Sequence, residues 1–291
     1  MWFPVRLSWG LAVAVLWGAG IARVGAQGPL PTPVHIGATK SIYDEFGQKL
    51  QGNAEEPGDL VQVLWASNDV VNAPNYDGSP DPENPPVEGG QTAIGKMTPR
   101  NLSQPGYFSL SIADPRPGDG SKIFVRVFNA RNLSDASFYV DSPVYTVDGN
   151  SVIEVSVGAT TNPIDPRDFD ADGLHNSWEK SLGSDPNDPD TDKDGMPDGD
   201  EFAAGTDVLD SNDLVRICRV SPAGGNEICL TFDSEPGTNY VVQAATNDLS
   251  ADGVTFEDLS GIITATGEWM TVTVSNALDY GAAQFRVKVD R

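Results

Sequence analysis

Short runs of β-branched and aromatic residues, bounded by Gly, Pro, Asn and Asp, recur through the first half of the chain. Such runs are typical of strands in a β-sandwich. In one of them Ile123, Val125 and Val127 can line one face while Phe124 and Phe128 cover the other, which predicts a central strand. The predicted strands are residues 60–65, 107–112, 123–128, 138–147 and 152–157. We therefore expect a β-sandwich module over residues 27–161.

A second and smaller set of such runs fills residues 214–291. The candidate strands are residues 214–220, 228–232, 240–245, 261–266, 269–274 and 285–289. Helix is expected only as short pieces in residues 162–213, between the two sets of strands. The predicted fold class is mainly β, with two β-sandwich modules joined by an Asp-rich repeat that carries short helices.

Residues 72–105 break the strand pattern, with seven prolines and many glycines. Proline cannot donate to a strand ladder, so an irregular surface loop is expected there. A role of this loop in contacting a ligand is left open.

The two cysteines lie in the predicted hairpin that opens the second β module. If Ile217 pairs with Leu230 across a turn at residues 221–226, Cys218 stands opposite Cys229. Directly opposed strand residues are close enough for a disulfide, and an exported chain meets an oxidising compartment. A Cys218–Cys229 disulfide is therefore predicted, with two unpaired thiols as the alternative.

The formal net charge is −24, and more than half of it falls in residues 162–213, which hold sixteen Asp and Glu against three Arg and Lys. So acidic a chain is a poor partner for nucleic acid. A disordered acidic tail is also a poor description, because the carboxylates follow a fixed spacing and apolar side chains stand among them.

Two stretches of twelve residues repeat one pattern: the first loop (residues 168–179) and the second loop (residues 190–201). Each has acidic side chains at positions 1, 3 and 5, glycine at position 6 and glutamate at position 12. Ca²⁺ takes six to eight oxygens at ~2.3–2.6 Å, and the glycine allows the sharp turn that brings short side chains onto one ion. The backbone carbonyl at position 7 and the side chain at position 9 would add ligands. The predicted calcium ligands are Asp168, Asp170, Asp172, Leu174, Asn176 and Glu179 in the first loop and Asp190, Asp192, Asp194, Met196, Asp198 and Glu201 in the second.

The repeat also carries a few apolar side chains of its own. Leu174, Trp178 and Leu182 form one helical stripe, and Met196 and Phe202 are expected to pack with the second loop. This cluster is too small to hold so many carboxylates together, so folding and calcium binding of residues 162–213 are expected to be coupled. Five acidic ligands against four predict tighter binding in the second loop.

These loops differ from EF-hands, which place each loop between two long helices. Prolines precede the first loop. One turn of helix after the glutamate of each loop the chain reaches a glycine, Gly183 after the first loop and Gly205 after the second. The segment instead resembles the bacterial thrombospondin type 3 repeat. The matching residues are 168–179, Gly183-Ser-Asp185-Pro186, 190–195 and Gly205-Thr-Asp207, about 50 of 291.

That resemblance implies calcium binding in the loops and a stiff, calcium-ordered connector in a secreted or cell-surface protein. The chain departs from the pattern at Val208, which replaces a proline, and no third loop follows. Four further aspartates recur at the same period, either to complete the ligand shells or to cap turns. They are Asp185, Asp188, Asp207 and Asp210. Residues 214–291 resemble, more loosely, the fibronectin-like modules that accompany such repeats.

The N-terminus predicts export. Arg6 is followed by an uncharged apolar stretch to Ala22, and the small residues at 24–26 suit cleavage before Gln27. A secretory signal peptide is expected over residues 1–26, because the stretch is shorter than the ~20 residues of a spanning helix. The mature chain is then a secreted or cell-surface protein without a membrane span.

No catalytic pattern is found, and an enzyme is not expected. His35 stands alone, and His175 lies at position 8 of the first loop, which is expected to face outward. Neither has a nucleophile at a recognisable spacing. The alternative to a connector is a calcium-dependent recognition module that binds glycans or another surface protein, as in a dockerin-like adhesion protein.

Overall fold

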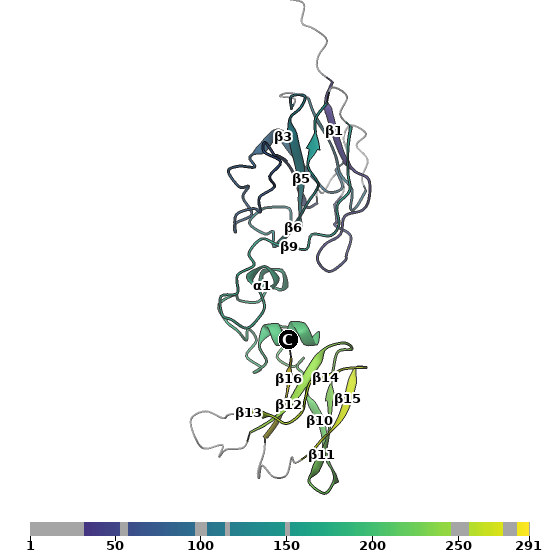
Figure 1. Cartoon of the computed structure of the whole chain (residues 1–291), viewed down its shortest axis with the longest axis vertical. Helices are drawn as coiled ribbons and strands as arrows, with labels where there is room; N and C mark the ends of the chain where they lie inside the picture. The colour runs from purple at the N-terminus through teal and green to yellow at the C-terminus, as the bar shows by residue number, and fades with distance from the viewer. Residues whose placement is uncertain are drawn as a thin grey trace, which may run out of the picture.

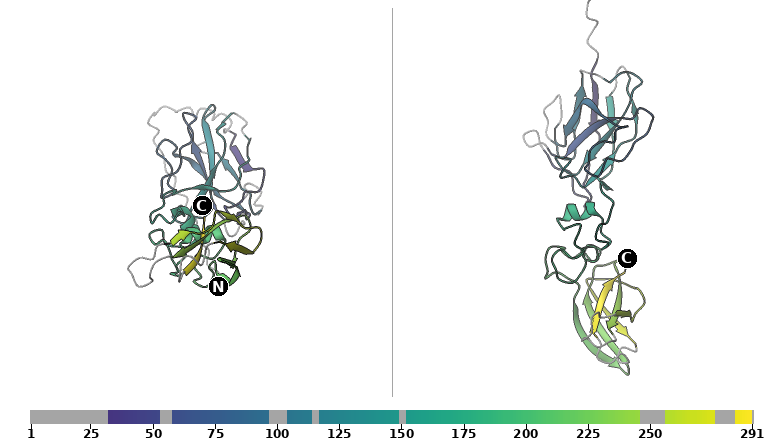
Figure 2. Two further views of the ribbon diagram at one scale, coloured as in Figure 1. Left: turned by 60° about the horizontal axis from the view of Figure 1, so that its bottom comes forward. Right: turned by 90° about the vertical axis from the view of Figure 1, so that its left-hand side faces the viewer.

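The computed structural model describes residues 32–52, 58–96, 104–113, 117–148, 152–245, 256–275 and 284–290. The molecule is long, with one β module at each end and the acidic repeat between them (Figures 1 and 2). The predicted mainly-β fold is confirmed. The predicted signal peptide, residues 1–26, lies outside the described residues. Within those residues no helix combines the length and the apolar character needed to cross a membrane.

The N-terminal module consists of two sheets that face each other. In the smaller sheet, β1 (Val34–Ala38) lies between β4 (Ser109–Ile112) and β8 (Val152–Val155). The larger sheet has the order β3 (Pro86–Ala93), β2 (Leu60–Trp65), β5 (Lys122–Phe128), β6 (Phe138–Asp141) and β9 (Asn162–Pro163), and β7 (Tyr145–Thr146) also pairs with β5. One core joins both sheets, since Ile36 and Ile153 of the first pack with Val63 and Val125 of the second.

The prediction that residues 123–128 form a central strand is confirmed. β5 pairs with β2 on one side and with β6 and β7 on the other. Its alternate residues Ile123, Val125 and Val127 enter the core between the sheets, while Phe124 and Phe128 are buried in separate clusters.

The prediction of an irregular loop over residues 72–105 is wrong in part, because β3 pairs with β2. A register shift in β2 accommodates two glycines in β3. Gly89 has φ of +69°, and a Cβ on Gly90 would lie 2.8 Å from the Val87 carbonyl oxygen. These glycines are needed for an irregular strand rather than for a loop.

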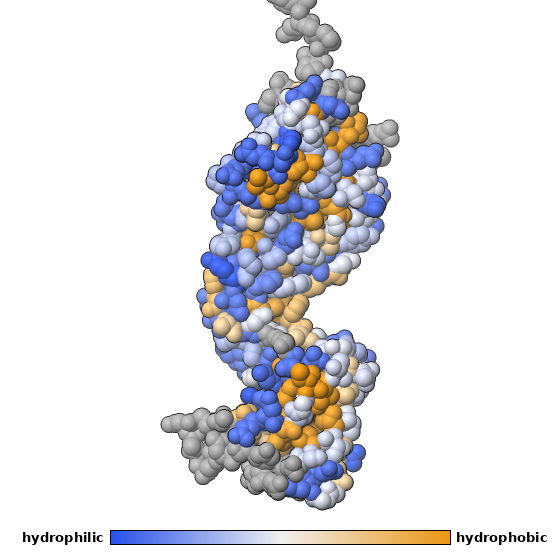
Figure 3. All heavy atoms as spheres, viewed as in Figure 1, coloured by the Kyte–Doolittle hydropathy of each residue, from blue (hydrophilic) through white to orange (hydrophobic). Residues whose placement is uncertain are grey.

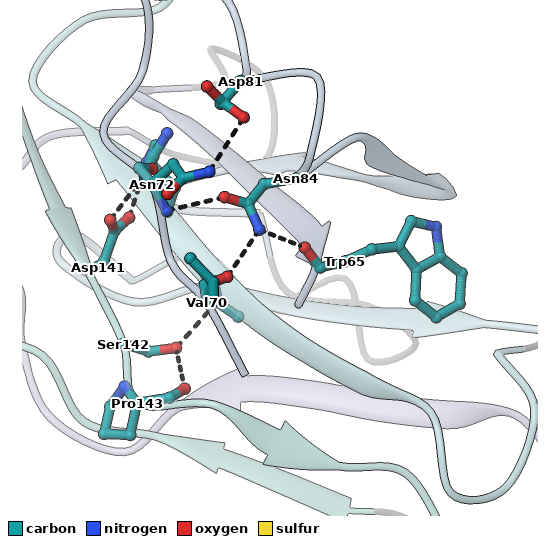
Figure 4. A network of polar contacts seen from close by, with 10 residues as sticks. Trp65, Val70, Asn72, Asp81, Asn84, Asp141, Ser142 and Pro143 are labelled. Atoms are coloured by element: carbon teal, nitrogen blue, oxygen red, sulfur yellow. Dashed lines mark hydrogen bonds and ion pairs between the residues drawn. The ribbon is translucent and has the colours of Figure 1, made fainter. Parts of the chain in front are cut away.

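Residues 66–85, which connect β2 to β3, form a loop held by a buried amide. The Asn84 Nδ2 donates to the carbonyls of Trp65 and Val70, both at 2.8 Å, and its Oδ1 accepts from the Asn72 N–H (Figure 4). The fully buried Arg126 donates to the Asn72 carbonyl as well. The base of the loop is therefore fixed to the sheet.

The repeat contains two helices of seven residues, α1 (Asn176–Leu182) and α2 (Asp198–Ala204). Each ends at a glycine in the left-handed conformation, Gly183 with φ of +94° and Gly205 with φ of +77°. Such a residue closes the last turn without strain on a Cβ. The prediction of short helices within the repeat is confirmed.

The C-terminal module also has two sheets. The first has the order β10 (Ile217–Gly224), β11 (Glu227–Asp233) and β15 (Trp269–Val274). In the second, β12 (Asn239–Ala245) pairs with β13 (Phe256–Asp258), β14 (Ile263–Thr264) and β16 (Gln284–Val289). Leu230 of the first sheet packs against Val242 of the second. Apolar residues also gather on the outside of this module (Figure 3).

The predicted Cys218–Cys229 disulfide is wrong, because both cysteines are free. β10 continues to Gly224, through most of the turn predicted at residues 221–226, and the strand register shifts at Cys218. Cys229 consequently stands opposite Ser221. The Cys218 thiol lies instead 3.2 Å from the Asp233 carboxylate.

Candidate metal centre

The two loops have the same backbone course. Among the described residues only three non-glycine residues have a positive φ, and two of them occupy position 4 of the loops, Ala171 (+64°) and Lys193 (+67°). The glycines at position 6 follow with +92° in Gly173 and +98° in Gly195. Left-handed residues bend the chain sharply, so each loop wraps around a point on its own concave side.

The two loops also share their internal hydrogen bonds. The position 1 carboxylate accepts from the N–H of the position 6 glycine, and the position 5 carboxylate accepts from the N–H of position 7. The pairs are Asp168–Gly173 (3.1 Å), Asp190–Gly195 (3.0 Å), Asp172–Leu174 (2.7 Å) and Asp194–Met196 (2.7 Å). In the first loop the second oxygens of Asp168 and Asp172 also accept, from the N–H groups of Ala171 and Gly199. In the second loop Asp190 Oδ1 and Asp194 Oδ2 have no hydrogen-bond partner.

The structure brings the predicted aspartates together. In each loop, one carboxylate oxygen from each of positions 1, 3 and 5 lies within 4.8 Å of the other two. Several of the oxygens are buried without a hydrogen-bond partner, namely Asp170 Oδ2, Asp190 Oδ1, Asp192 Oδ2 and Asp194 Oδ2. Oxygens crowded in this way repel one another unless a cation lies among them.

The position 12 glutamates lie in the helices that follow the loops, and neither belongs to the close group of aspartate oxygens. Glu179 in α1 and Glu201 in α2 are fully buried. Both Glu179 oxygens and the Glu201 Oε2 have no hydrogen-bond partner. Burial, together with the charges of the loop aspartates, raises the pKa of each glutamate to about 8. A buried carboxylate without a partner is costly unless it is protonated or binds a cation.

The position 9 residues differ between the loops. The amide of Asn176 donates to the Asp165 carboxylate at 3.0 Å, while its Oδ1 is buried and unpartnered. Asp198 is fully buried and accepts from both the N–H and the hydroxyl of Thr191. Asp198 also helps to raise the pKa of Glu179 and of Glu201, so its charge acts on both loops.

The remaining predicted ligands lie at position 7, where the backbone carbonyl was expected to bind. Leu174 is buried within the repeat, and Met196 packs partly against the core of the C-terminal module. Position 7 thus lies where each loop meets its apolar surroundings.

His175 does not face outward as predicted. Its Nδ1 accepts from the Trp178 N–H at 3.2 Å and caps α1, and its ring lies 5.9 Å from the ring of Phe138 in β6. Burial lowers the pKa of His175. Because the imidazole serves the helix and packs on the N-terminal module, it is not directed into the loop.

The other aspartates at the repeat period cap turns. Asp185, Asp207 and Asp210 each accept from the backbone N–H two residues later, and Asp188 forms an ion pair with Lys193. An Asx turn of this kind stabilises the chain reversal between a helix and the next loop.

The first half of the repeat, which is the first loop with α1, is joined to the N-terminal module. The Trp178 ring lies 4.8 Å from Phe138 and 5.5 Å from Phe46. The Lys180 ammonium donates to two carbonyls of the β5–β6 connection, and the Ser181 hydroxyl donates to Glu45 at 2.6 Å. The sequence did not indicate these contacts, because the partners are 40 or more residues away.

The second half, which is the second loop with α2, is joined to the C-terminal module. Ala204 and Met196 pack with Phe232 and Tyr240, and the Thr238 hydroxyl donates to the carbonyl of Ala203 at 2.9 Å.

The two halves meet at two points. The Gly199 N–H, in the first turn of α2, donates to Asp172 of the first loop at 2.7 Å, and the Trp178 ring lies 4.7 Å from Phe202.

Each loop thus offers acidic oxygens and no nitrogen or sulfur among its predicted ligands. Hard divalent cations prefer oxygen, and a flexible loop of carboxylates suits the larger Ca²⁺ better than Mg²⁺, which keeps several waters. The donor set and the unpartnered oxygens therefore fit a hard divalent cation. Comparison of the chain with known protein families, with curated proteins and with solved structures finds no match.

Proposed function

We propose that this protein is a secreted or cell-surface connector in which two calcium ions order the acidic repeat between two β modules. One observation carries the proposal. Glu179 and Glu201 are fully buried, have oxygens without a partner, and are acted on by the charges of the loop aspartates. An ion bound in each loop would neutralise these charges and supply the missing partners.

The connector role is supported by the attachment of the two halves. α1 packs on the N-terminal module and α2 on the C-terminal module, so an ion in either loop would stiffen one end of the joint. A dockerin-like plug is less well supported, because both helices have only seven residues and Trp178 is engaged by aromatic rings of this chain.

Native mass spectrometry of the full mature chain with millimolar calcium tests the proposal. The expected result is two bound ions, reduced to one in Glu179→Gln and in Glu201→Gln and to none in the double variant. Replacement of Asp207 by Asn is a matched control, since its carboxylate caps a turn. Absence of bound calcium in the unaltered chain would contradict the proposal.

Solution scattering tests the mechanical part of the proposal. With calcium, the scattering should fit a single elongated shape such as that in Figures 1 and 2. Removal of calcium should broaden the distribution of distances between the modules, because the repulsion among the loop carboxylates is then uncompensated. An unchanged distribution would show that the joint is stiff without ions.

A further inference from the structure

A pocket of about 430 Å³ lies where the N-terminal module meets the first half of the repeat. Its volume falls in the range of ~300–1,000 Å³ of small-ligand sites. The walls include Tyr76 from the loop of residues 66–85, Ile164 after β9, and Phe169 and Pro186 from the repeat. Neither module forms this pocket alone.

Two of the wall residues are aromatic side chains exposed to solvent, Tyr76 at 58% and Phe169 at 52%. The Arg167 guanidinium lies over both rings, 4.1 Å from the centre of Tyr76 and 4.7 Å from that of Phe169. Two hydrogen bonds to Asp165, at 2.7 and 2.6 Å, hold the guanidinium in turn. Arg167 is not part of the pocket wall, so it fixes the rings while leaving them available to the pocket.

The Tyr76 turn is rigid. Asn75 and Ser79 are joined by a backbone hydrogen bond of 2.9 Å, and the Gly78 N–H donates to the Asn75 carbonyl at 2.8 Å. The base of the loop is fixed by Asn84 (Figure 4). A preformed aromatic surface loses little conformational entropy when a ligand binds.

The pocket also has a buried hydroxyl that lacks a partner. Ser184 is 8% exposed and lines the pocket, and its Oγ makes no hydrogen bond. A buried hydroxyl without a partner is unfavourable. A ligand that carries hydroxyl groups would satisfy it.

The charged groups of the wall are already engaged within the protein. Asp165 pairs with Arg167, and the Lys180 ammonium donates to the carbonyls of Ser134 and Ala136. A charged ligand would find no free counterion among these groups, so the wall favours a neutral ligand.

We propose that this pocket binds a neutral sugar unit of a glycan. The C–H face of a pyranose ring would stack on Tyr76 or Phe169, and one of its hydroxyl groups would reach Ser184. The inference rests on the proposed calcium function, because Phe169 belongs to the first loop. It gives residues 66–85 a role in ligand contact.

Saturation-transfer NMR and calorimetry on the full mature chain with millimolar calcium test this inference, using cellobiose, lactose and mannobiose as probes. Binding of at least one probe is expected, weakened about tenfold by Tyr76→Ala or Phe169→Ala. Ser184→Ala should weaken it less. Trp269→Ala is the matched control, since this exposed aromatic lies on β15 of the other module and its loss should leave binding unchanged.

Three outcomes would overturn the inference: no binding of any probe, equal binding by Tyr76→Ala and Trp269→Ala, or binding of proline-rich peptides in place of sugars at this surface. Native mass spectrometry of the same samples separates it from the calcium proposal. Two bound ions without sugar binding overturn this inference alone, whereas sugar binding without bound calcium overturns the proposed function alone. Circular dichroism confirms that each variant is folded.

Discussion

The first and second loops have the same backbone course and share several internal hydrogen bonds, yet their surroundings differ. The first loop and α1 are joined to the N-terminal module by aromatic rings and by Lys180, whereas the second loop and α2 enter the apolar core of the C-terminal module. The repeat therefore consists of two half-joints rather than one independent domain. Each half-joint is formed by one loop and its helix, packed against the adjacent β module. Each ion would stiffen the end of the module to which its loop is attached.

The loops also differ in the charge they offer. Position 9 is the neutral Asn176 in the first loop and the buried Asp198 in the second, which predicts tighter binding in the second loop. Asp198 helps to raise the pKa of both glutamates, so an ion bound in the second loop would also act on Glu179 in the first. The following substitutions and one pH series test this comparison of the two halves, from the largest expected effect on calcium binding or stability to the smallest.

Replacement of a position 12 glutamate should have the largest effect. Glu179→Gln and Glu201→Gln are each expected to weaken calcium binding in their own loop by at least about 100-fold, since changes behind a ligand already cost ~10–100-fold. Calorimetric titration of each variant measures the site that remains. The loops would not be separate sites if either substitution abolished both binding events.

Trp178→Ala should destabilise the first half-joint. An aromatic-to-alanine change in a core costs ~3–5 kcal/mol, and since Trp178 is only partly buried we expect about 2–3 kcal/mol. Urea unfolding of the calcium-loaded protein measures the change. Phe202→Ala, which removes only the contact between the halves, should cost less, and an equal cost would argue against docking through Phe138.

The pH dependence of the metal-free protein has a definite sign. Both glutamates have a folded pKa of about 8, above the ordinary value of 4.5, so the folded state binds more protons between these values. The free energy of unfolding should then fall as the pH rises from about 4.5 to about 8. Calcium affinity should rise over the same range, because the ion displaces these protons.

Thermal melting of metal-free protein between pH 5 and pH 8.5 measures this dependence. The Glu179→Gln, Glu201→Gln double variant is the control and should lack this contribution. A melting temperature that rises with pH more steeply in the unaltered chain than in the control would contradict the raised pKa values.

Thr238→Val should have the smallest effect, confined to the second half-joint. It removes the hydrogen bond to the Ala203 carbonyl, which is worth about 1 kcal/mol. Lys180→Met is the corresponding change in the first half, where the two carbonyls lose their donor. Calcium titration should show Thr238→Val weakening the second loop alone, and an equal loss in both loops would show that the halves are coupled more strongly than we propose.

The sequence predicted what local patterns determine. The central strand over residues 123–128 and the helix ends at Gly183 and Gly205 follow from periodicity and from glycine chemistry. The aspartates of both loops meet because their spacing alone defines the turn.

The features that depend on contacts between distant segments were not predicted. β3 was not predicted, because Gly89 and Gly90 are unusual within a strand. They fit there only because the pairing of β3 with β2 has a register shift. The Cys218–Cys229 pairing was predicted wrongly because a similar shift falls at Cys218. The contacts of Trp178 with Phe46 and of Arg167 with Tyr76 join segments more than 90 residues apart, and no periodicity in a single sequence records them.

The hydrogen bond from Gly199 to Asp172 has a mechanical consequence. If the two ends of the molecule were pulled apart, part of the load would pass from α2 through this bond into a carboxylate of the first loop. An ion bound by that carboxylate would oppose extension of the molecule. The force needed to extend the molecule would then depend on the calcium concentration of its surroundings.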